Sequence, residues 1–415
     1  MRVLTLTEAV AAKFLAGRRS GDAAADRVAS RIIADVRRRG DAALFYWCRK
    51  LDGARLTPKS MWIRRSEMEA AEVSADLVKA LKHAIRNIRR VAEQQLPRPW
   101  SMDVEPGVRV SQRVTPLDTI GCYVPGGRFS LVSTLLMSVV PAQVAGVRRI
   151  VAVCPRPNAA LLTAAKLLGI TEFARIGGAQ GVAALAYGTK SVPRVDKIFG
   201  PGNRYVTAAK RLISSDCAVD MLAGPTEVLI VAQKGTARYI ASDILAQAEH
   251  DPDAVALFVT TSRKLAADVG DCVAEELSAL PPTNLARRAL MDNGAILLAP
   301  NVDAAVRFAN QFAAEHLSVP DADPVLLRKL TCAGSIFVGP WSAQSVGDYA
   351  SGTNHVLPTS GGARARGGLS TWDFVRCTTV QRLSRKGLQS VAPVVSELAQ
   401  AEGLVAHRRA VEVRR

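Results

Sequence analysis

From about residue 117 onward, short apolar runs alternate with amphipathic helical segments, and this alternation limits the folds open to the chain. Strands that alternate with helices of about 10–15 residues are typical of parallel sheets covered on both faces. Two such series are present, so the sequence predicts an α/β fold with two Rossmann-like parallel-sheet modules. The first series places strands over 149–154, 172–176 and 197–199 and helices over 158–168, 180–187 and 204–214. The second places strands over 227–232, 254–260, 295–298 and 335–339 and helices over 237–249, 263–277 and 302–312.

The two ends of the chain have a helical pattern. Residues 26–39 and 68–95 carry apolar residues at three- and four-residue spacing, and the prolines of 97–99 end the second pattern. The tail after about residue 370 is charged and is also expected to be helical. We therefore expect an N-terminal helical segment over 1–17 and a helical tail over 370–415. Between them we expect a discontinuous α/β domain over 18–122 and 227–369 and a second Rossmann-like domain over 123–226.

The chain carries a formal net charge of +17. Its basic residues are dispersed, and short runs such as 37–39 and 408–409 lack interleaved aromatic side chains, so no nucleic-acid partner is predicted. Salt-dependent binding to nucleic acid stays open as an alternative of another class.

No run of about 18 apolar residues and no secretory signal is visible, which predicts a cytoplasmic protein without a membrane partner. The seven cysteines form no CxxC pair, so neither a thiolate zinc site nor a disulfide framework is expected.

Three glycine-containing segments stand where a predicted strand meets a predicted helix: 123–127, 177–180 and 200–203. Ligands of parallel sheets settle at the carboxyl ends of the strands, and glycine lets the backbone approach a phosphate there. Gln180 and Asn203 stand at two of these helix starts, with amide groups free to bind a ligand. None of the three segments is a GxGxxG fingerprint, so a plain tight turn is the alternative interpretation.

The chain has only five histidines, which makes their neighbours informative. Gln247 and His250 lie three residues apart at a helix end and share a face. With Asp348 in a glycine-rich loop and His407 in the tail, they offer two oxygen and two nitrogen donors, a plausible zinc set with open positions. The dispersed spacing leaves ordinary surface or core histidines as the alternative.

Glu315 and His316 form a second pair, between an amphipathic helix and a strand-like run. Histidine is suited to taking a proton near neutral pH, so His316 could act as a base and Glu315 could activate a water. A helix-end carboxylate and histidine without a chemical role is the alternative.

Eight segments together resemble the histidinol dehydrogenase family over almost the whole chain. They are Tyr-Val-Pro-Gly-Gly at 123–127, Gly-Gly-Ala-Gln at 177–180, Phe-Gly-Pro-Gly-Asn at 199–203, Asp-Met-Leu-Ala-Gly-Pro-Thr-Glu-Val at 220–228, Gln-Ala-Glu-His at 247–250, Ala-Glu-His-Leu at 314–317, Gly-Asp-Tyr-Ala-Ser-Gly-Thr-Asn-His-Val-Leu-Pro-Thr at 347–359 and Ala-Glu-Gly-Leu-Val-Ala-His at 401–407. The resemblance implies two successive oxidations, from L-histidinol through L-histidinaldehyde to L-histidine, with two NAD consumed in turn. This is the last step of histidine biosynthesis.

The resemblance also implies roles for individual residues. His316 is implied as the general base, with Glu315 assisting the water. One zinc ion per subunit is implied to be held by Gln247, His250, Asp348 and His407. Substrate contacts are implied for these four residues and for Thr226, His316 and Glu402, and contacts with NAD for Tyr123, Gln180 and Asn203.

The family is similar in being a homodimer whose C-terminal segment reaches the partner's active site, so Glu402 and His407 would serve the neighbouring subunit. Thr226 stands where serine is usual, which keeps the hydroxyl and adds a methyl group. No cysteine falls in a motif that suits a nucleophile, so no covalent cysteine step is expected. The alternatives are a zinc- and NAD-dependent dehydrogenase of the same fold acting on another small polar alcohol, and zinc-dependent hydrolysis without a redox cofactor.

Overall fold

The structure, a computed structural model, describes residues 1–16, 18, 22–126 and 131–414. One part of it, the five-stranded module, is built on a parallel sheet with the strand order β6-β5-β4-β7-β8. Its strands are β4 (Thr119–Tyr123), β5 (Arg149–Val153), β6 (Glu172–Ala174), β7 (Lys197–Phe199) and β8 (Ala218–Val219). The predicted α/β class with parallel sheets is confirmed.

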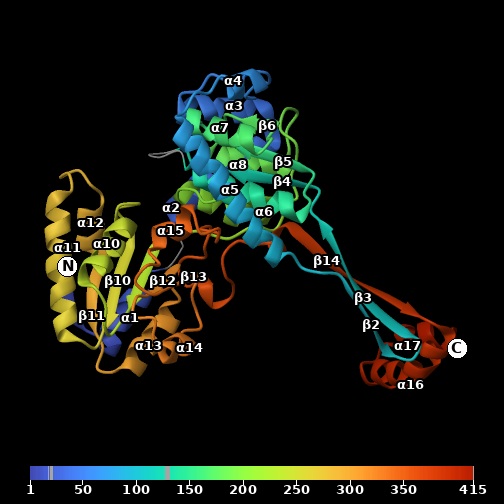
Figure 1. Cartoon of the computed structure of the whole chain (residues 1–415). Coiled ribbons are helices and arrows are strands. Elements are labelled where there is room, and N and C mark those ends of the chain that lie inside the picture. Colours follow the sequence, from blue (N-terminus) through green and yellow to red (C-terminus); the bar gives the residue numbers. More distant parts are fainter. Residues whose placement is uncertain (17, 19–21, 127–130, 415) are drawn as a thin grey trace.

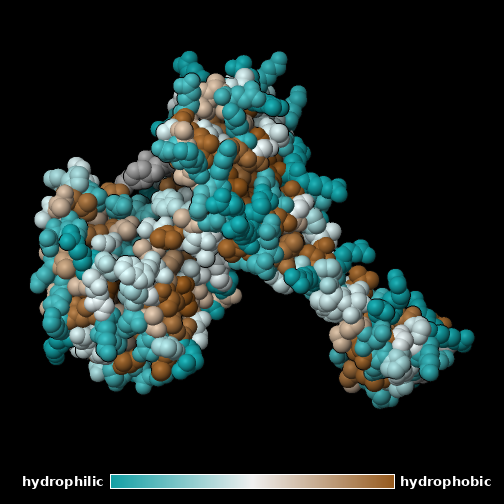
Figure 2. All heavy atoms as spheres, viewed as in Figure 1, coloured by the Kyte–Doolittle hydropathy of each residue, from teal (hydrophilic) through white to brown (hydrophobic). Residues whose placement is uncertain are grey.

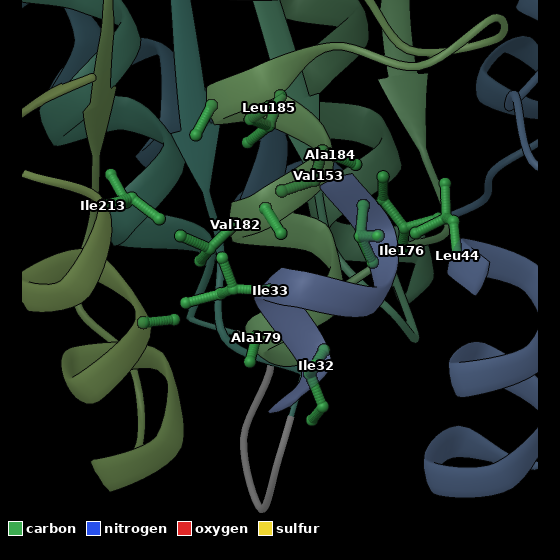
Figure 3. Packing of buried hydrophobic residues seen from close by; sticks show 14 of the residues in the cluster. Ile32, Ile33, Leu44, Val153, Ile176, Ala179, Val182, Ala184, Leu185 and Ile213 are labelled. Atoms are coloured by element: carbon green, nitrogen blue, oxygen red, sulfur yellow. The ribbon is translucent and has the colours of Figure 1, made fainter. Parts of the chain in front are cut away.

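Helices cover both faces of this sheet. One face carries α2 (Ala23–Arg39), α3 (Asp41–Trp47), α8 (Gly178–Tyr187) and α9 (Arg204–Ile213), and the other carries α5 (Ala75–Gln95), α6 (Val132–Ala145) and α7 (Ala159–Leu167). The buried residues of α2 recur every three or four positions, so one stripe of the helix faces the core. Figure 3 shows Ile32 and Ile33 on this stripe, packed toward Ala179 and Val182 of α8.

The other part, the six-stranded module, has the parallel strand order β1-β11-β10-β9-β12-β13. Its strands are β1 (Arg2–Thr5), β9 (Glu227–Val231), β10 (Val255–Thr260), β11 (Gly294–Leu298), β12 (His316–Val319) and β13 (Ser335–Val338). One face is covered by α10 (Ala237–Ala248), α11 (Arg263–Ala279) and α12 (Ala286–Asn293), and the other by α1 (Glu8–Ala16), α13 (Val302–Phe312) and α14 (Pro324–Lys329). β9 is buried along its whole length, which explains the unbroken apolar run from Val228 to Val231 that follows Glu227.

A three-stranded antiparallel ribbon, which we call the arm, extends away from both modules (Figure 1). It consists of β2 (Trp100–Glu105), β3 (Val108–Pro116) and β14 (Val375–Leu383), and its tip carries α16 (Arg385–Ala401) and α17 (Val405–Glu412). The expectation of an entirely helical tail is therefore wrong, because residues 375–383 form a strand. Their partner lies far away in sequence, since Val380 pairs with Ser111, so no local pattern marks the ribbon.

The expected grouping of the N-terminal residues also differs from the packing. Residues 1–17 were expected to be helical, but β1 pairs with β11 at the edge of the six-stranded sheet. Residues 18–122 were grouped with 227–369, whereas α2 and α5 bury their apolar faces in the five-stranded module. The apolar faces of these helices pack against apolar residues of the five-stranded sheet and its other helices. Whether each part is an independent folding domain stays a prediction.

The remaining elements are short connections. They are a π-helical turn (Cys48–Asp52), α4 (Arg65–Glu69), α15 (Gln344–Tyr349) and 3₁₀ turns at Gly362–Arg364 and Thr371–Phe374. Within the described ranges, no helix combines the length and the apolar character that a bilayer crossing requires.

Gly200, directly after β7, generates a test of this fold. Its φ is +109°, and a Cβ there would overlap the carbonyl oxygen of Tyr123. We expect Gly200→Ala to lower the free energy of unfolding by about 3 kcal/mol or more, because backbone strain and steric overlap add. Gly169→Ala is the matched control: its φ is +68° with nothing within 4 Å, so only about 1 kcal/mol is expected. Urea denaturation of both variants measures this, and equal losses would contradict it.

Candidate active site

A cavity of about 180 Å³ lies where the two modules meet. The five-stranded module contributes the carboxyl ends of its strands, through Gly200 and Asp220. The six-stranded module contributes instead the amino ends of β9 and β12, through Thr226 and His316. The expected position at carboxyl ends therefore describes only one of the two sheets. The other lining residues include Leu131, Ser133, Thr134, Pro201, Lys210, Met221, Gln247, His250, Glu315, Asp348, Tyr349, His355 and Thr359.

The five-stranded sheet reverses its strand order next to this cavity. The chain runs from β4 to β5 and β6 on one side, and then returns to place β7 and β8 on the other side of β4. The loops after Tyr123 and Phe199 diverge at this switch point, where a parallel sheet offers a crevice for ligands. Gly127, part of the first glycine segment, lies outside the described residues.

His316 is the first residue of β12 and is only 4% exposed. Its Nδ1 lies 3.1 Å from the carbonyl oxygen of Glu227, an acceptor only, so Nδ1 carries the hydrogen in the neutral ring. The Nε2 atom then holds the lone pair. Among the described residues it has no hydrogen-bond partner, and it lies 3.6 Å from Oδ1 of Asp348. In its neutral form the ring therefore presents a proton acceptor beside Asp348 in the cavity wall.

The charge of His316 depends on two carboxylates. Burial is the largest influence and by itself lowers the pKa of His316, but the charges of Glu315 and Asp348 outweigh it and raise the pKa to about 10. A cation or substrate amine that neutralises Asp348 would bring this pKa down, because one of the two opposing charges would be cancelled.

Glu315 precedes His316 and is 7% exposed. Its Oε2 accepts hydrogen bonds from the hydroxyl of Thr226, at 2.5 Å, and from the backbone N–H of Glu227, at 2.8 Å. Thr226 in turn accepts a hydrogen bond from Nε2 of Gln247. A continuous polar chain therefore links the end of α10 to the Glu315–His316 pair. The structure brings both predicted catalytic candidates into the cavity.

The structure brings together three of the four predicted metal ligands. Gln247 is buried, and its Oε1 accepts from Nε2 of Gln344 at 2.9 Å. His250 and Asp348 line the same cavity, and the Asp348 side chain is 15% exposed. His407 is elsewhere: it lies on α17 at the tip of the arm, with the substrate candidate Glu402 at the end of α16 (Figure 1). Accordingly, no group of three His, Cys, Asp or Glu side chains poised for a metal occurs within the described part of one chain.

The three cofactor candidates lie around the carboxyl edge of the five-stranded sheet. Tyr123 is buried and accepts a hydrogen bond from the N–H of Gly178 at 3.1 Å. Gln180 donates from Nε2 to Asp52 at 3.0 Å, and its buried Oε1 has no partner among the described residues. Asn203 caps α9 by accepting from the backbone N–H groups of residues 205 and 206, which leaves its NH₂ free of that role. It lines a neighbouring cavity of about 460 Å³.

Sequence reasoning missed a buried ion pair beside the cavity. Lys210 is 2% exposed, pairs with Asp220, and donates to the carbonyl oxygen of Gly200 at 2.9 Å. Asp220 accepts from the N–H of Gly200 at 2.7 Å, so the pair fixes both sides of one peptide position. A lysine at a buried position of the α9 stripe was the available signal.

Comparison with known proteins places this geometry in a family. A family model described as histidinol dehydrogenase matches residues 16–415. The histidinol dehydrogenase of Vibrio parahaemolyticus is 47% identical over 92% of this chain and 90% of that protein. The one from Halalkalibacterium halodurans is 42% identical over 100% of this chain and 99% of that protein. The crystal structure of histidinol dehydrogenase from Elizabethkingia anophelis superimposes with a TM-score of 0.93, at 34% identity, over 100% of this chain and 98% of that chain. This chain therefore belongs to the histidinol dehydrogenase family of oxidoreductases.

Proposed function

We propose that this chain oxidises L-histidinol through L-histidinaldehyde to L-histidine, the last step of histidine biosynthesis, with NAD as the electron acceptor. The observation that carries the proposal is the position of Glu315 and His316. They stand at the head of β12, facing a cavity that also holds Gln247, His250 and Asp348. Family membership supports the same reaction. A cytoplasmic location stays a prediction.

The proposed chemistry uses His316 as the base. In each oxidation the substrate carbon loses a hydride and the attached oxygen loses a proton, which Nε2 of His316 accepts. Between the two oxidations one water adds to the aldehyde carbon. We assign to Glu315, which accepts hydrogen bonds from Thr226 and the backbone of Glu227, the transfer of a proton from that water to the former carbonyl oxygen. When bound, NAD supplies the hydride acceptor, one molecule for each step. We assign its contacts to Tyr123, Gln180 and Asn203.

The residues in the cavity fit a zinc site that a further side chain would complete. Gln247, His250 and Asp348 offer an amide oxygen, an imidazole nitrogen and a carboxylate oxygen, all donors that zinc accepts. We propose that His407 of a second copy supplies the fourth ligand. When bound, zinc would hold the amine and the imidazole of histidinol as an orienting template. Thr226 and Glu402 are the further substrate contacts that we propose.

The exposed surface of the arm supports a homodimer. Val394, Leu398 and Val405 on α16 and α17 are 60%, 61% and 75% exposed, and Figure 2 shows hydrophobic side chains gathered on the arm's tip. An apolar groove between α5 and α6 adjoins Asp348 and Tyr349. We propose that the tip of one copy packs against this groove of another, because exposed apolar area of this extent marks an interaction surface. This packing would carry Glu402 and His407 to the partner's cavity.

The first test is an absorbance assay for NADH formation. The purified chain with histidinol and NAD should form two NADH per histidinol consumed, because both oxidations occur at one site. Treatment with a metal chelator should abolish turnover, and added zinc should restore it.

In the same assay, His316→Asn should lower kcat by about a hundredfold or more, as expected for loss of a general base. Turnover of another small polar alcohol in preference to histidinol would overturn the proposed substrate, and turnover without nicotinamide reduction would overturn the reaction class.

Complementation between two inactive variants tests the shared site. His316→Asn damages a site from within, and His407→Asn is expected to damage the site of the partner. In a mixed dimer both lesions then fall in the same site and leave the other intact. Unfolding and refolding the two variants together should therefore restore about a quarter of the wild-type activity, if subunits pair at random. Each variant refolded alone is the control. No recovery in the mixture, with dimers verified by light scattering, would contradict the exchange of His407.

Two cysteines near the cofactor edge test the absence of a covalent step. Cys122 and Cys154 are buried, and burial raises the pKa of Cys122 strongly and that of Cys154 to about 11. Because the thiolate is the nucleophile, neither thiol suits attack on an aldehyde near neutral pH. Cys122→Ala and Cys154→Ala should each leave kcat largely unchanged in the NADH assay. Loss of turnover, together with a thioester trapped on the wild-type chain and seen by mass spectrometry, would refute this prediction.

A further inference from the structure

In the sequence, Arg18 stands between a helix of the six-stranded module and a helix of the five-stranded module. α1 ends at Ala16 in the six-stranded module, and Asp22 caps the start of α2, which packs on the five-stranded module. The side chain of Arg18 is nonetheless only 7% exposed. Burying a guanidinium is costly unless it is paired, so its partners indicate what it is for.

The guanidinium of Arg18 has two sets of partners. Its Nε donates to Oε1 of Glu227 at 2.7 Å, and one terminal nitrogen pairs with Oε2 of the same carboxylate. The other terminal nitrogen donates to the carbonyl oxygen of Phe312, and the guanidinium carbon stacks 3.7 Å from the centroid of the Phe312 ring. This fork joins the start of β9 to the end of α13.

Each of these partners leads directly to the catalytic pair. The backbone N–H of Glu227 donates to Glu315, and its carbonyl oxygen accepts from His316. Phe312 is three residues before Glu315, across a turn in which Ala313 has a φ of +48°. A left-handed conformation at a residue with a side chain is strained and persists only where its surroundings hold it. Arg18 therefore binds the Glu227 side chain and the Phe312 backbone, and so holds together the strand start and the turn that position Glu315 and His316.

We propose that Arg18 is a positioning residue, whose guanidinium fork sets the orientation of Glu315 and His316 by clamping Glu227 and the turn after α13. The inference rests on the proposed function, in which this pair performs the chemistry. The charge of Arg18 also pairs with that of Glu227, whose carboxylate is otherwise opposed by the neighbouring charge of Glu315. An apolar pair of similar size often stabilises a fold as well as a buried ion pair does, so stability alone does not explain this arginine.

Steady-state kinetics of the full-length, zinc-loaded enzyme separate positioning from binding. We expect Arg18→Met to lower kcat on the order of a hundredfold, because a shift of about 1 Å in a reacting group has this effect. KM for histidinol and for NAD should stay unchanged, because no substrate or cofactor contact is altered. Arg18→Lys keeps the charge but not the planar fork, and should recover only part of the loss.

Arg364 provides the matched control. Its guanidinium donates to the carbonyl oxygen of Gln311, the residue before Phe312, but in the described structure it forms no hydrogen bond or ion pair with Glu227. Arg364→Met should keep the wild-type kcat. If Arg18→Met does not fold, Arg18→Lys carries the test, together with the double variant Arg18→Met/Glu227→Met, which removes both buried charges. Added guanidinium ion should raise kcat of Arg18→Ala and leave Arg364→Met unchanged.

The outcomes distinguish this inference from the proposed function. A wild-type chain that does not oxidise histidinol would refute the proposed function. The clamp is still measured then, through the ¹⁵N chemical shifts of His316, which report how its two ring nitrogens are engaged and are assigned by their loss in His316→Asn. Arg18→Lys should shift these signals. A wild-type kcat in folded Arg18→Met or in the double variant, or unchanged ¹⁵N signals in Arg18→Lys, would overturn the inference.

Discussion

The parallel register of β12 against β9 is the constraint on which the site depends. It sets His316 opposite Val228, and this alignment puts the imidazole Nδ1 within reach of the carbonyl oxygen of Glu227 and Glu315 within reach of its N–H. Successive side chains of a strand point to opposite faces, so a slip by one residue would turn His316 away from the cavity. The register is in turn secured by burial, because every residue of both strands is buried. The chemistry of the pair is thus fixed by the hydrophobic core around it.

The cavity lies between two parallel sheets that present opposite ends of their strands to it. The five-stranded module presents the carboxyl ends of its strands, where glycine allows the backbone turn at Gly200 and the buried Lys210–Asp220 pair fixes it. The six-stranded module presents amino ends, where His316 and Thr226 stand. Because residues 220–227 run directly from one edge to the other, a single short segment carries both kinds of surface. A ligand in this cavity meets the strand-switch crevice on one side and the Glu315–His316 pair on the other.

Local sequence patterns predicted most of the parallel strands and the Glu315–His316 pair. The apolar residues 228–232 indicated the buried parallel strand predicted over 227–232, and Glu315 and His316 stand out because they lie between an amphipathic helix and a strand-like run. The arm could not be predicted in this way, since residues 375–383 become a strand only by pairing with residues 108–116. β1 and the packing of α2 likewise depend on partners more than a hundred residues away. Arg18 carries no sequence signal of its own, because its significance comes from Glu227 and Phe312, which are distant in the chain.

The ribbon of the arm bears on how the chain is made. Ser111 and Val380 are 269 residues apart, so β3 leaves the ribosome long before the strand that completes it. Until then the β2–β3 hairpin has an open edge of unpaired backbone groups, the kind of surface on which neighbouring chains pair wrongly. Pairings of such sequence separation are also slow to form, because the intervening loop must first be closed. The hairpin therefore stays incomplete until residues 375–383 have been synthesised, and during this interval its edge is exposed to wrong pairing.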